Sequence, residues 1–294
     1  MSLRVHILFP IEIINRELDF RLFQACLAAR PNNRIFIGQN NTIYRVLKSL
    51  RGGIYVGKNI RPSVGSMRDL HMHRYQTMKQ NGFILLHLDE EGGVMAGDEE
   101  RWKQWLHHRL DVKCLAADDH VCTWGNWQQY FYQAQEPACK DNITTTGHPR
   151  FDLYKKENRQ YFEAEANKIR ERYGDFILIN TNFAWANHAR HTRFIFSKPW
   201  GYEPENPTRR MDHVNQWGFT WRVLSGMVEL VTRLSVEMPH LNYVFRPHPS
   251  ENLGFYQTIF SDVANVHVMH EGSVGAWLLA SQAMIHDGCT TAIE

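Results

Sequence analysis

Residues 83–93 read FILLHLDEEGG, an apolar run that ends in three carboxylates and two glycines. An almost unbroken apolar run of this length is typical of a parallel strand buried on both faces of its sheet. We therefore predict an α/β protein with a doubly wound sheet. In open sheets of this kind ligands bind beyond the carboxyl ends of the strands, so the polar residues that follow a strand are the ones to inspect.

The sequence on both sides of this stretch alternates short apolar segments with segments of helical periodicity. Strands are predicted at residues 5–9, 34–37, 53–56, 83–88, 112–116, 143–145, 176–180, 241–246, 266–269 and 283–286. Helices are predicted at residues 19–29, 41–50, 64–79, 99–110, 125–135, 156–173, 213–237, 253–260 and 273–281. This order predicts two Rossmann-like domains facing a central cleft.

The composition changes after the Gly-His-Pro-Arg segment at 147–150, where a highly charged helix follows. We place the domain boundary there, with one domain at residues 1–152 and the other at residues 153–294. The sequence stops at Glu294, inside what reads as the first turn of another helix. Folds with two such lobes normally finish with closing helices, so we expect the chain to be truncated at its C-terminus.

Composition excludes several classes of protein. With 33 Lys plus Arg against 31 Asp plus Glu the net charge is only +2, so we expect no nucleic-acid partner. No stretch approaches the roughly 20 apolar residues of a membrane span, and the N-terminus lacks a secretory leader, which predicts a cytoplasmic protein. The five cysteines lack a C-x-x-C pair, and the 16 histidines lack an H-E-x-x-H motif, so we expect neither a metal site nor a cofactor.

Asp89, Glu90, Glu91 and Gly92 form the first candidate site. Close carboxylates raise one another's pKa and so favour a proton acceptor, which makes a general base the natural interpretation. The glycine would let a substrate approach the backbone closely. An acidic turn facing solvent is the alternative.

The second candidate site is the segment from Arg246 to Glu251, which follows the strand at 241–246. Prolines on both sides of His248 fix the backbone and favour a single pose of its imidazole. Such a histidine can stabilise or protonate the phosphate of a departing nucleotide. A structural histidine in a turn is the alternative. The residues predicted here are Arg246, His248, Pro249, Ser250 and Glu251.

The third candidate site follows the strand at 283–286 and comprises Asp287, Gly288, Thr290 and Thr291. Backbone amides at a helix N-terminus, together with threonine hydroxyls, can bind a phosphate without any net positive charge. The threonines can instead be simple helix caps.

These three motifs resemble those of bacterial sialyltransferases and of the Kdo transferases of capsule and O-antigen synthesis. Those families carry an acidic pair followed by glycine, then His-Pro, then a Ser/Thr pair, and here Glu90-Glu91-Gly92, His248-Pro249 and Thr290-Thr291 stand in that order. The segment at 147–152 is similar to the lobe junction of such transferases. The chain is most similar to the surface carbohydrate biosynthesis proteins, which are related to retaining β-Kdo transferases.

The resemblance implies a GT-B-like fold, a CMP-sugar donor, and a cell-surface polysaccharide or glycolipid acceptor. It assigns catalysis to Glu90 with Glu91 beside it, phosphate contact to His248, and phosphate-binding hydroxyls to Thr290 and Thr291. The acidic motif is extended by Asp89, which leaves the acting carboxylate open, and the sequence does not decide between inversion and retention. Arg246 and Arg150 are candidates to pair with the donor's carboxylate or phosphate.

Two other functions compete with this one. A CDP-glycerol or CDP-ribitol polymer phosphotransferase shares the His-Pro motif, but should use a second histidine in place of the carboxylates. A catalytically inactive nucleotide-binding subunit is the other. Because polysaccharide acceptors are often lipid-linked, peripheral contact with the inner face of the membrane is a further expectation, through Trp102, Lys103, Trp105 and Arg109, although a half-buried helix explains these residues equally well.

Overall fold

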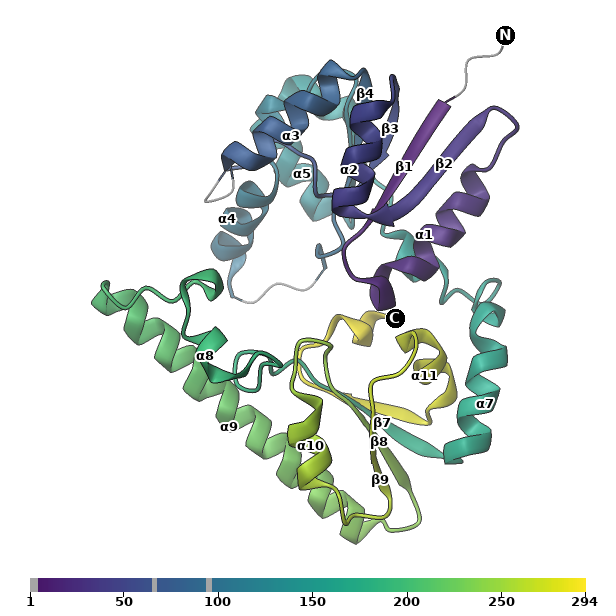
Figure 1. Ribbon diagram of the computed structural model, residues 1–294, viewed down its shortest axis with the longest axis vertical. Helices are drawn as coiled ribbons and strands as arrows, with labels where there is room; N and C mark the ends of the chain where they lie inside the picture. The colour runs from purple at the N-terminus through teal and green to yellow at the C-terminus, as the bar shows by residue number, and fades with distance from the viewer. Residues whose placement is uncertain (1–4, 65–67, 94–96) are drawn as a thin grey trace. The chain divides into compact units, whose positions relative to one another are not determined.

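The computed structural model describes residues 5–64, 68–93 and 97–294. The chain divides into two compact units, Met1–Asn158 (unit 1) and Arg159–Glu294 (unit 2), whereas the sequence placed the boundary after residue 152. Each unit is an α/β sandwich around its own parallel sheet (Figure 1).

Unit 1 has a six-stranded sheet in the order β2-β1-β3-β4-β5-β6, and all its strand pairs are parallel. The strands are β1 (Val5–Ile11), β2 (Asn33–Gln39), β3 (Gly53–Val56), β4 (Phe83–Leu88), β5 (His120–Thr123) and β6 (Ile143–Thr145). The strand order reverses between β1 and β3, so the topological switch point of this sheet lies between their carboxyl ends.

The helices of unit 1 cover both faces of this sheet. They are α1 (Ile14–Ala28), α2 (Asn40–Ser49), α3 (Arg68–Gln80), α4 (Glu99–Arg109), α5 (Asn126–Gln135) and the short α6 (Pro149–Asp152), with 3-10 turns η1 (Val112–Cys114) and η2 (Pro137–Asn142). Leu8, Tyr55 and Phe83 pack with residues of α2 and α3 in one core cluster, whereas Ile7 and Phe9 belong to a second cluster with residues of α1. Successive strand residues thus point to opposite faces, as the pleat requires.

The strand predicted at residues 112–116 is wrong. Asp111 accepts a hydrogen bond from the amide of Lys113 and so caps a 3-10 turn there, and the strand β5 follows at His120–Thr123. Part of the helix predicted at 64–79 lies outside the described residues, and α3 begins at Arg68.

Unit 2 has a four-stranded parallel sheet in the order β10-β7-β8-β9. The strands are β7 (Phe176–Asn180), β8 (Asn242–Arg246), β9 (Val266–Val268) and β10 (Ala283–His286). Since the chain runs from β7 through β8 to β9 and then returns to the other side of β7, the switch point lies between β7 and β10.

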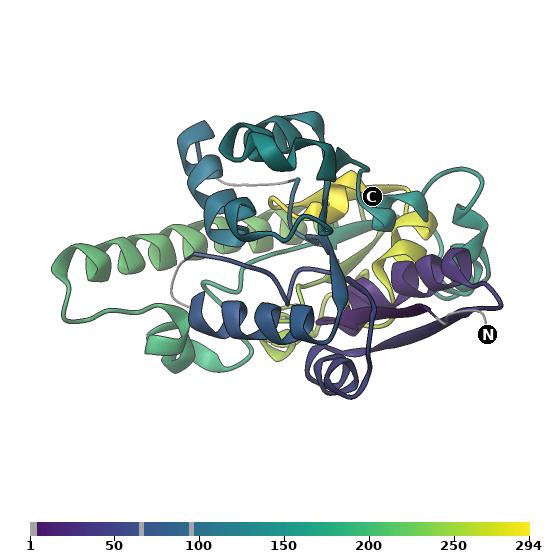
Figure 2. The same cartoon turned by 90° about the horizontal axis from the view of Figure 1, so that it is seen from above.

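The helices of unit 2 are α7 (Glu163–Tyr173), α8 (His191–Ile195), α9 (Pro207–Glu237), α10 (Leu253–Ile259) and α11 (Val274–Ala280), with 3-10 turns η3 (Arg159–Phe162), η4 (Lys198–Trp200) and η5 (Thr290–Ile293). Ile179, Tyr243 and Phe245 pack against α9 and α10, while Phe176 contacts Trp277 of α11. Helix α9 is the long green helix in Figure 2. Helix α9 begins earlier than predicted, because Asn206 caps it and Pro207 occupies its first turn. None of the helices in the described ranges has the length and hydropathy to cross a bilayer.

Candidate functional site

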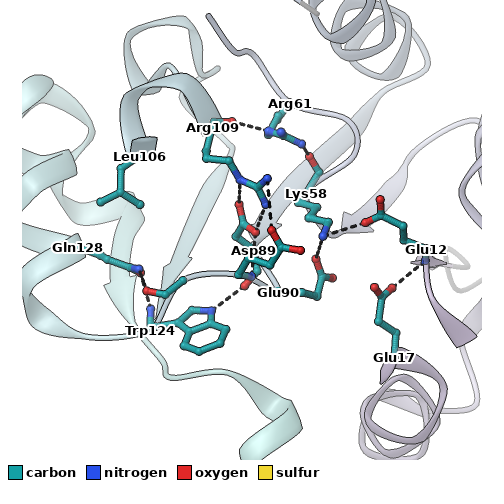
Figure 3. A network of polar contacts seen from close by, with 12 residues as sticks. Glu12, Glu17, Lys58, Arg61, Asp89, Glu90, Leu106, Arg109, Trp124 and Gln128 are labelled. Carbon is teal, nitrogen blue, oxygen red and sulfur yellow. Dashed lines mark hydrogen bonds and ion pairs between the residues drawn. The ribbon is translucent and has the colours of Figure 1, made fainter. Parts of the chain in front are cut away.

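The acidic motif follows β4 at the carboxyl edge of the unit 1 sheet, but its three carboxylates have different environments. Glu90 is only 2% exposed and forms two ion pairs, one with Arg21 Nη2 at 2.7 Å and one with Lys58 Nζ at 3.2 Å. Burial raises the pKa of Glu90, while the charges of Lys58 and Arg21 act against this rise. Figure 3 shows Lys58 between Glu90 and Glu12, to which it is also paired at 2.9 Å.

Asp89 is held by Arg109, whose guanidinium donates to both carboxylate oxygens, with Nε to Oδ2 at 2.7 Å. Burial would raise the pKa of Asp89, but the Arg109 charge outweighs burial and keeps this pKa well below its usual range. Arg109 also lies over the ring of Trp105, 4.7 Å from its centroid. The side chains predicted for membrane contact, Trp102, Lys103, Trp105 and Arg109, are therefore all partly buried within unit 1.

Glu91 is the accessible carboxylate of the three, with 46% of its side chain exposed. Its oxygens lie 3.3 Å from Arg16 Nη1 and 3.8 Å from Arg109 Nη1, so two cations flank it without enclosing it. A carboxylate this exposed is accessible to a substrate, whereas the buried Glu90 is not.

Gly92 lies against the protein itself. A Cβ at this position would stand 2.6 Å from the ring of Trp124, and the Gly92 carbonyl accepts a hydrogen bond from Gln128 Nε2. Trp124 Nε1 in turn donates to the Asp89 carbonyl at 2.6 Å. The glycine is therefore required for packing of the Asp89–Gly92 turn, and the approach of a substrate to its backbone stays a prediction.

In unit 2 the His-Pro segment forms a closed turn directly after β8. The amide of Ser250 donates to His248 Nδ1 at 3.2 Å, and the Ser250 hydroxyl lies 2.6 Å from the same nitrogen. An amide can only donate, so Nδ1 acts as the acceptor in the neutral imidazole and the proton resides on Nε2. Arg246, predicted to meet the ligand, donates from Nη2 to the Gly272 carbonyl at 2.8 Å. Pro249 completes the turn between His248 and Ser250.

Glu251 closes the same turn from inside the protein. Its side chain is 4% exposed, and its carboxylate accepts hydrogen bonds from the His248 amide at 2.9 Å, the Thr181 hydroxyl at 2.8 Å and the Tyr256 hydroxyl. Burial raises the pKa of Glu251, and these donors oppose the rise. The carboxylate predicted to bind substrate is thus occupied by donors of the chain itself.

The third motif follows β10. The hydroxyl of Thr291 accepts a hydrogen bond from Asn180 Nδ2 at 3.1 Å, and Gly288 adopts a positive φ of 56° with open space around its missing Cβ. Burial raises the pKa of Asp287. The predicted helix is here only the 3-10 turn η5, which begins at Thr290.

The two motifs of unit 2 meet at the end of β7. Asn180 contacts the threonine turn and Thr181 contacts Glu251 of the His-Pro turn. Neither residue was identified from the sequence, although both stand at a strand end, which is the signal that located the other motifs. Lys58 in unit 1 was missed in the same way, whereas Arg21 and Tyr256 lie inside helices and gave no signal.

No protein-family model matches the chain, and no curated protein matches it. Several solved structures are similar to the chain. A UDP-GlcNAc 2-epimerase from Neisseria meningitidis bound to UDP-GlcNAc is 12% identical with a TM-score of 0.51, covering 97% of this chain and 78% of that one. S. aureus MnaA with UDP is 10% identical with a TM-score of 0.51, over 97% of this chain and 74% of the other.

The fold is GT-B-like. At such identities the likeness concerns the fold, and it agrees with the predicted class, an α/β chain with two Rossmann-like parallel sheets.

Proposed function

We propose that this chain is a glycosyltransferase that uses a nucleotide-sugar donor, and that unit 2 holds the donor's phosphate. The observation that carries the proposal is the set of neutral donors at the carboxyl ends of β8, β7 and β10. His248, Ser250 and the two threonines lie on either side of the switch point between β7 and β10, where Rossmann-like sheets bind their ligands. The fold is shared with an epimerase solved with a sugar nucleotide, which supports the same ligand class.

In this proposal His248 donates from Nε2 to a phosphate oxygen of the leaving nucleotide. The bond between sugar and phosphate breaks through an oxocarbenium-like state, so negative charge grows on the phosphate as the sugar departs. A preorganised donor aimed at this charge stabilises the transition state, and the hydroxyls of Thr290 and Thr291 serve the same purpose.

We assign the acceptor chemistry to the acidic motif of unit 1, and within it to Glu91. The family resemblance assigns this role to Glu90, but Glu90 is buried between Arg21 and Lys58, and Asp89 is taken by Arg109. Glu91 remains accessible beside Arg16. In an inverting reaction it would remove the proton from the acceptor hydroxyl, and in a retaining reaction a carboxylate would act as the nucleophile.

The finer proposal is a CMP-linked acidic sugar, Kdo or sialic acid, transferred to a surface glycan or lipid-linked glycan. Its support is the order of the three motifs along the chain. A thermal-shift panel of CMP, CDP, UDP and GDP, followed by turnover assays with CMP-Kdo, CMP-sialic acid and CDP-glycerol, tests it. We expect stabilisation by CMP above the other nucleotides and turnover of a CMP-sugar, because at equal concentration the ligand that binds the folded state most tightly stabilises it most. Turnover of CDP-glycerol alone would instead identify a polymer phosphotransferase, and CMP binding without turnover an inactive subunit.

Replacement of the imidazole tests the phosphate contact directly. His248→Ala should weaken CMP binding and lower the rate of transfer by about 10²-fold, since one preorganised donor at a growing charge contributes on this order. His240→Ala, at an exposed histidine in the same unit, is the matched control and should leave both unchanged. If the two variants bind CMP equally well by calorimetry, the proposed phosphate site is wrong.

A further inference from the structure

Glu251 differs from the other residues of the His-Pro turn because its carboxylate faces the protein interior. Its two oxygens accept from the His248 amide, the Thr181 hydroxyl and the Tyr256 hydroxyl, and no cation pairs with it among the described residues. A buried carboxylate lowers the stability of the folded state unless its oxygens accept hydrogen bonds. Here neutral donors from separate segments satisfy it, and the Phe183 backbone contributes as well.

The contacts of Glu251 fix the backbone on which His248 stands. The Glu251 side chain holds the His248 amide at 2.9 Å, and the Glu251 amide donates to the His248 carbonyl at 2.8 Å. The turn is tied to the neighbouring segment as well, because the Ala189 amide donates to the Ser250 carbonyl and the Asn252 amide donates to the Asn187 carbonyl. The imidazole therefore has a rigid base, while its orientation is set by Ser250.

Thr181 and Tyr256 anchor this carboxylate to the rest of unit 2. Thr181 follows β7, the central strand at the switch point, and Tyr256 lies in α10 with its ring 4.6 Å from that of Phe245 in the core. Both side chains are almost completely buried. The network therefore connects the His-Pro turn to the buried core of unit 2.

We propose that Glu251, held by Thr181 and Tyr256, is a positioning residue that acts on the donor phosphate through His248. This inference rests on the proposed function, in which His248 meets that phosphate. Groups behind a binding residue that lock its pose are needed to keep the geometry within the tolerance that such chemistry requires. Loss of the network should therefore misplace the imidazole without removing it.

Glu251→Gln and Tyr256→Phe test the proposal at both ends of the network. A glutamine places an amide donor where one of the donors now finds an oxygen, and so breaks at least one of the hydrogen bonds. Tyr256→Phe removes only the hydroxyl and preserves the ring packing. Tyr243→Phe is the matched control, because Tyr243 is equally buried in the same sheet and its hydroxyl donates to the Leu234 carbonyl, away from the turn.

The readouts are CMP affinity by calorimetry, stability by urea unfolding, and the ¹⁵N signals of the His248 imidazole, identified as those missing from His248→Ala. We expect Glu251→Gln and Tyr256→Phe to lower CMP affinity about tenfold and to change the His248 tautomer signals, since small displacements of an aligned group carry costs of this order or larger. Tyr243→Phe should change stability only. If Tyr256→Phe and Glu251→Gln leave the His248 signals and CMP affinity at the level of Tyr243→Phe, the positioning role is wrong. If His248→Ala itself binds CMP normally, the proposed function fails instead.

Discussion

Glu90 and Arg21 form an ion pair from which water is almost excluded, since the arginine is fully buried and the glutamate nearly so. The Arg21 guanidinium lies over the ring of Phe20, 4.9 Å from its centroid, and donates to Gln24 at 2.9 Å. When one partner of such a pair is removed, the remaining charge is left uncompensated in a medium of low polarity. The first consequence of changing Glu90 should therefore concern stability.

Glu90→Gln should lower the free energy of unfolding by about 3 kcal/mol, the typical cost of breaking a buried pair. Urea unfolding measures this effect. Glu91→Gln is the matched control, because its exposed side chain should leave stability almost unchanged while transfer is lost. A Glu90→Gln protein that is as stable as the unaltered chain but inactive would return the catalytic role to Glu90.

Inspecting the residues that follow parallel strands locates candidate residues in the sequence but does not reveal which side chains contact them. It predicted Asp89, Glu90 and Glu91 as a group, yet Lys58, Arg21 and Arg109 decide what each carboxylate can do. These cations come from β3–α3, α1 and α4, which are far apart in the chain. Their pairing depends on the packing of the helices, which the apolar pattern of a single sequence does not reveal.

At the scale of elements, two helical glycines in unit 2 should respond in opposite ways to the same substitution. Gly226 lies in α9 with open space around its missing Cβ, whereas a Cβ on Gly275 of α11 would stand 2.5 Å from the ring of Phe162. Gly226→Ala should stabilise the protein by about 0.5–1 kcal/mol, because alanine loses less backbone entropy in a helix.

Gly275→Ala should instead destabilise by about 1–3 kcal/mol, the usual cost of overpacking. Thermal unfolding of the two single variants measures both effects against one reference. Equal shifts in the same direction would show that Phe162 moves aside without cost.

Elements with a strong apolar pattern were predicted to the residue. The strands β3, β4, β6, β7 and β10 have the predicted bounds, and all of them except β6 are short runs of mainly apolar residues. The pattern failed for β5, whose His-Val-Cys-Thr sequence is weakly apolar, while the more apolar segment before it forms η1. The apolar pattern also placed the start of α9 too late, because Asn206 caps this helix ahead of its apolar residues.

At the scale of the whole molecule, acid should destabilise the fold through buried neutral histidines. Burial lowers the pKa of His87 to about 3 and that of His148 to about 2. In the unfolded chain these groups titrate near pH 6.5, so below that pH the unfolded state binds protons that the folded state does not bind. Stability should fall as the pH decreases from about 6.5 toward 3, and each histidine should remove about 2 kcal/mol between pH 7 and pH 5.

Urea unfolding at pH 7, 6 and 5 measures this dependence, and His87→Gln isolates one of its sources. The variant should lose less stability over the same interval. The raised pKa of Glu90 changes stability with pH in the opposite direction, but this contribution is the same in both proteins and cancels when they are compared. Parallel curves for the two proteins would show that His87 is protonated in the folded state.

The division into two Rossmann-like units was predictable because both halves repeat the same alternation of strand and helix. The acidic, His-Pro and threonine motifs were predictable for a related reason, since parallel strands place their carboxyl ends at one edge of a sheet. The environments of the side chains within these motifs were not predictable, because burial separates Glu91 from Glu90 and turns Glu251 toward the protein interior.

Asn180 and Thr181 are neighbours at the end of one strand, and one contacts the threonine turn while the other contacts the His-Pro turn. Exchange of either turn for that of another protein would have to preserve a side chain that forms a hydrogen bond with one of these two residues. A grafted turn without a counterpart of Glu251 would leave the Thr181 hydroxyl buried with no acceptor. Under the proposed function, a change of donor specificity would therefore require exchange of both turns together with Asn180 and Thr181.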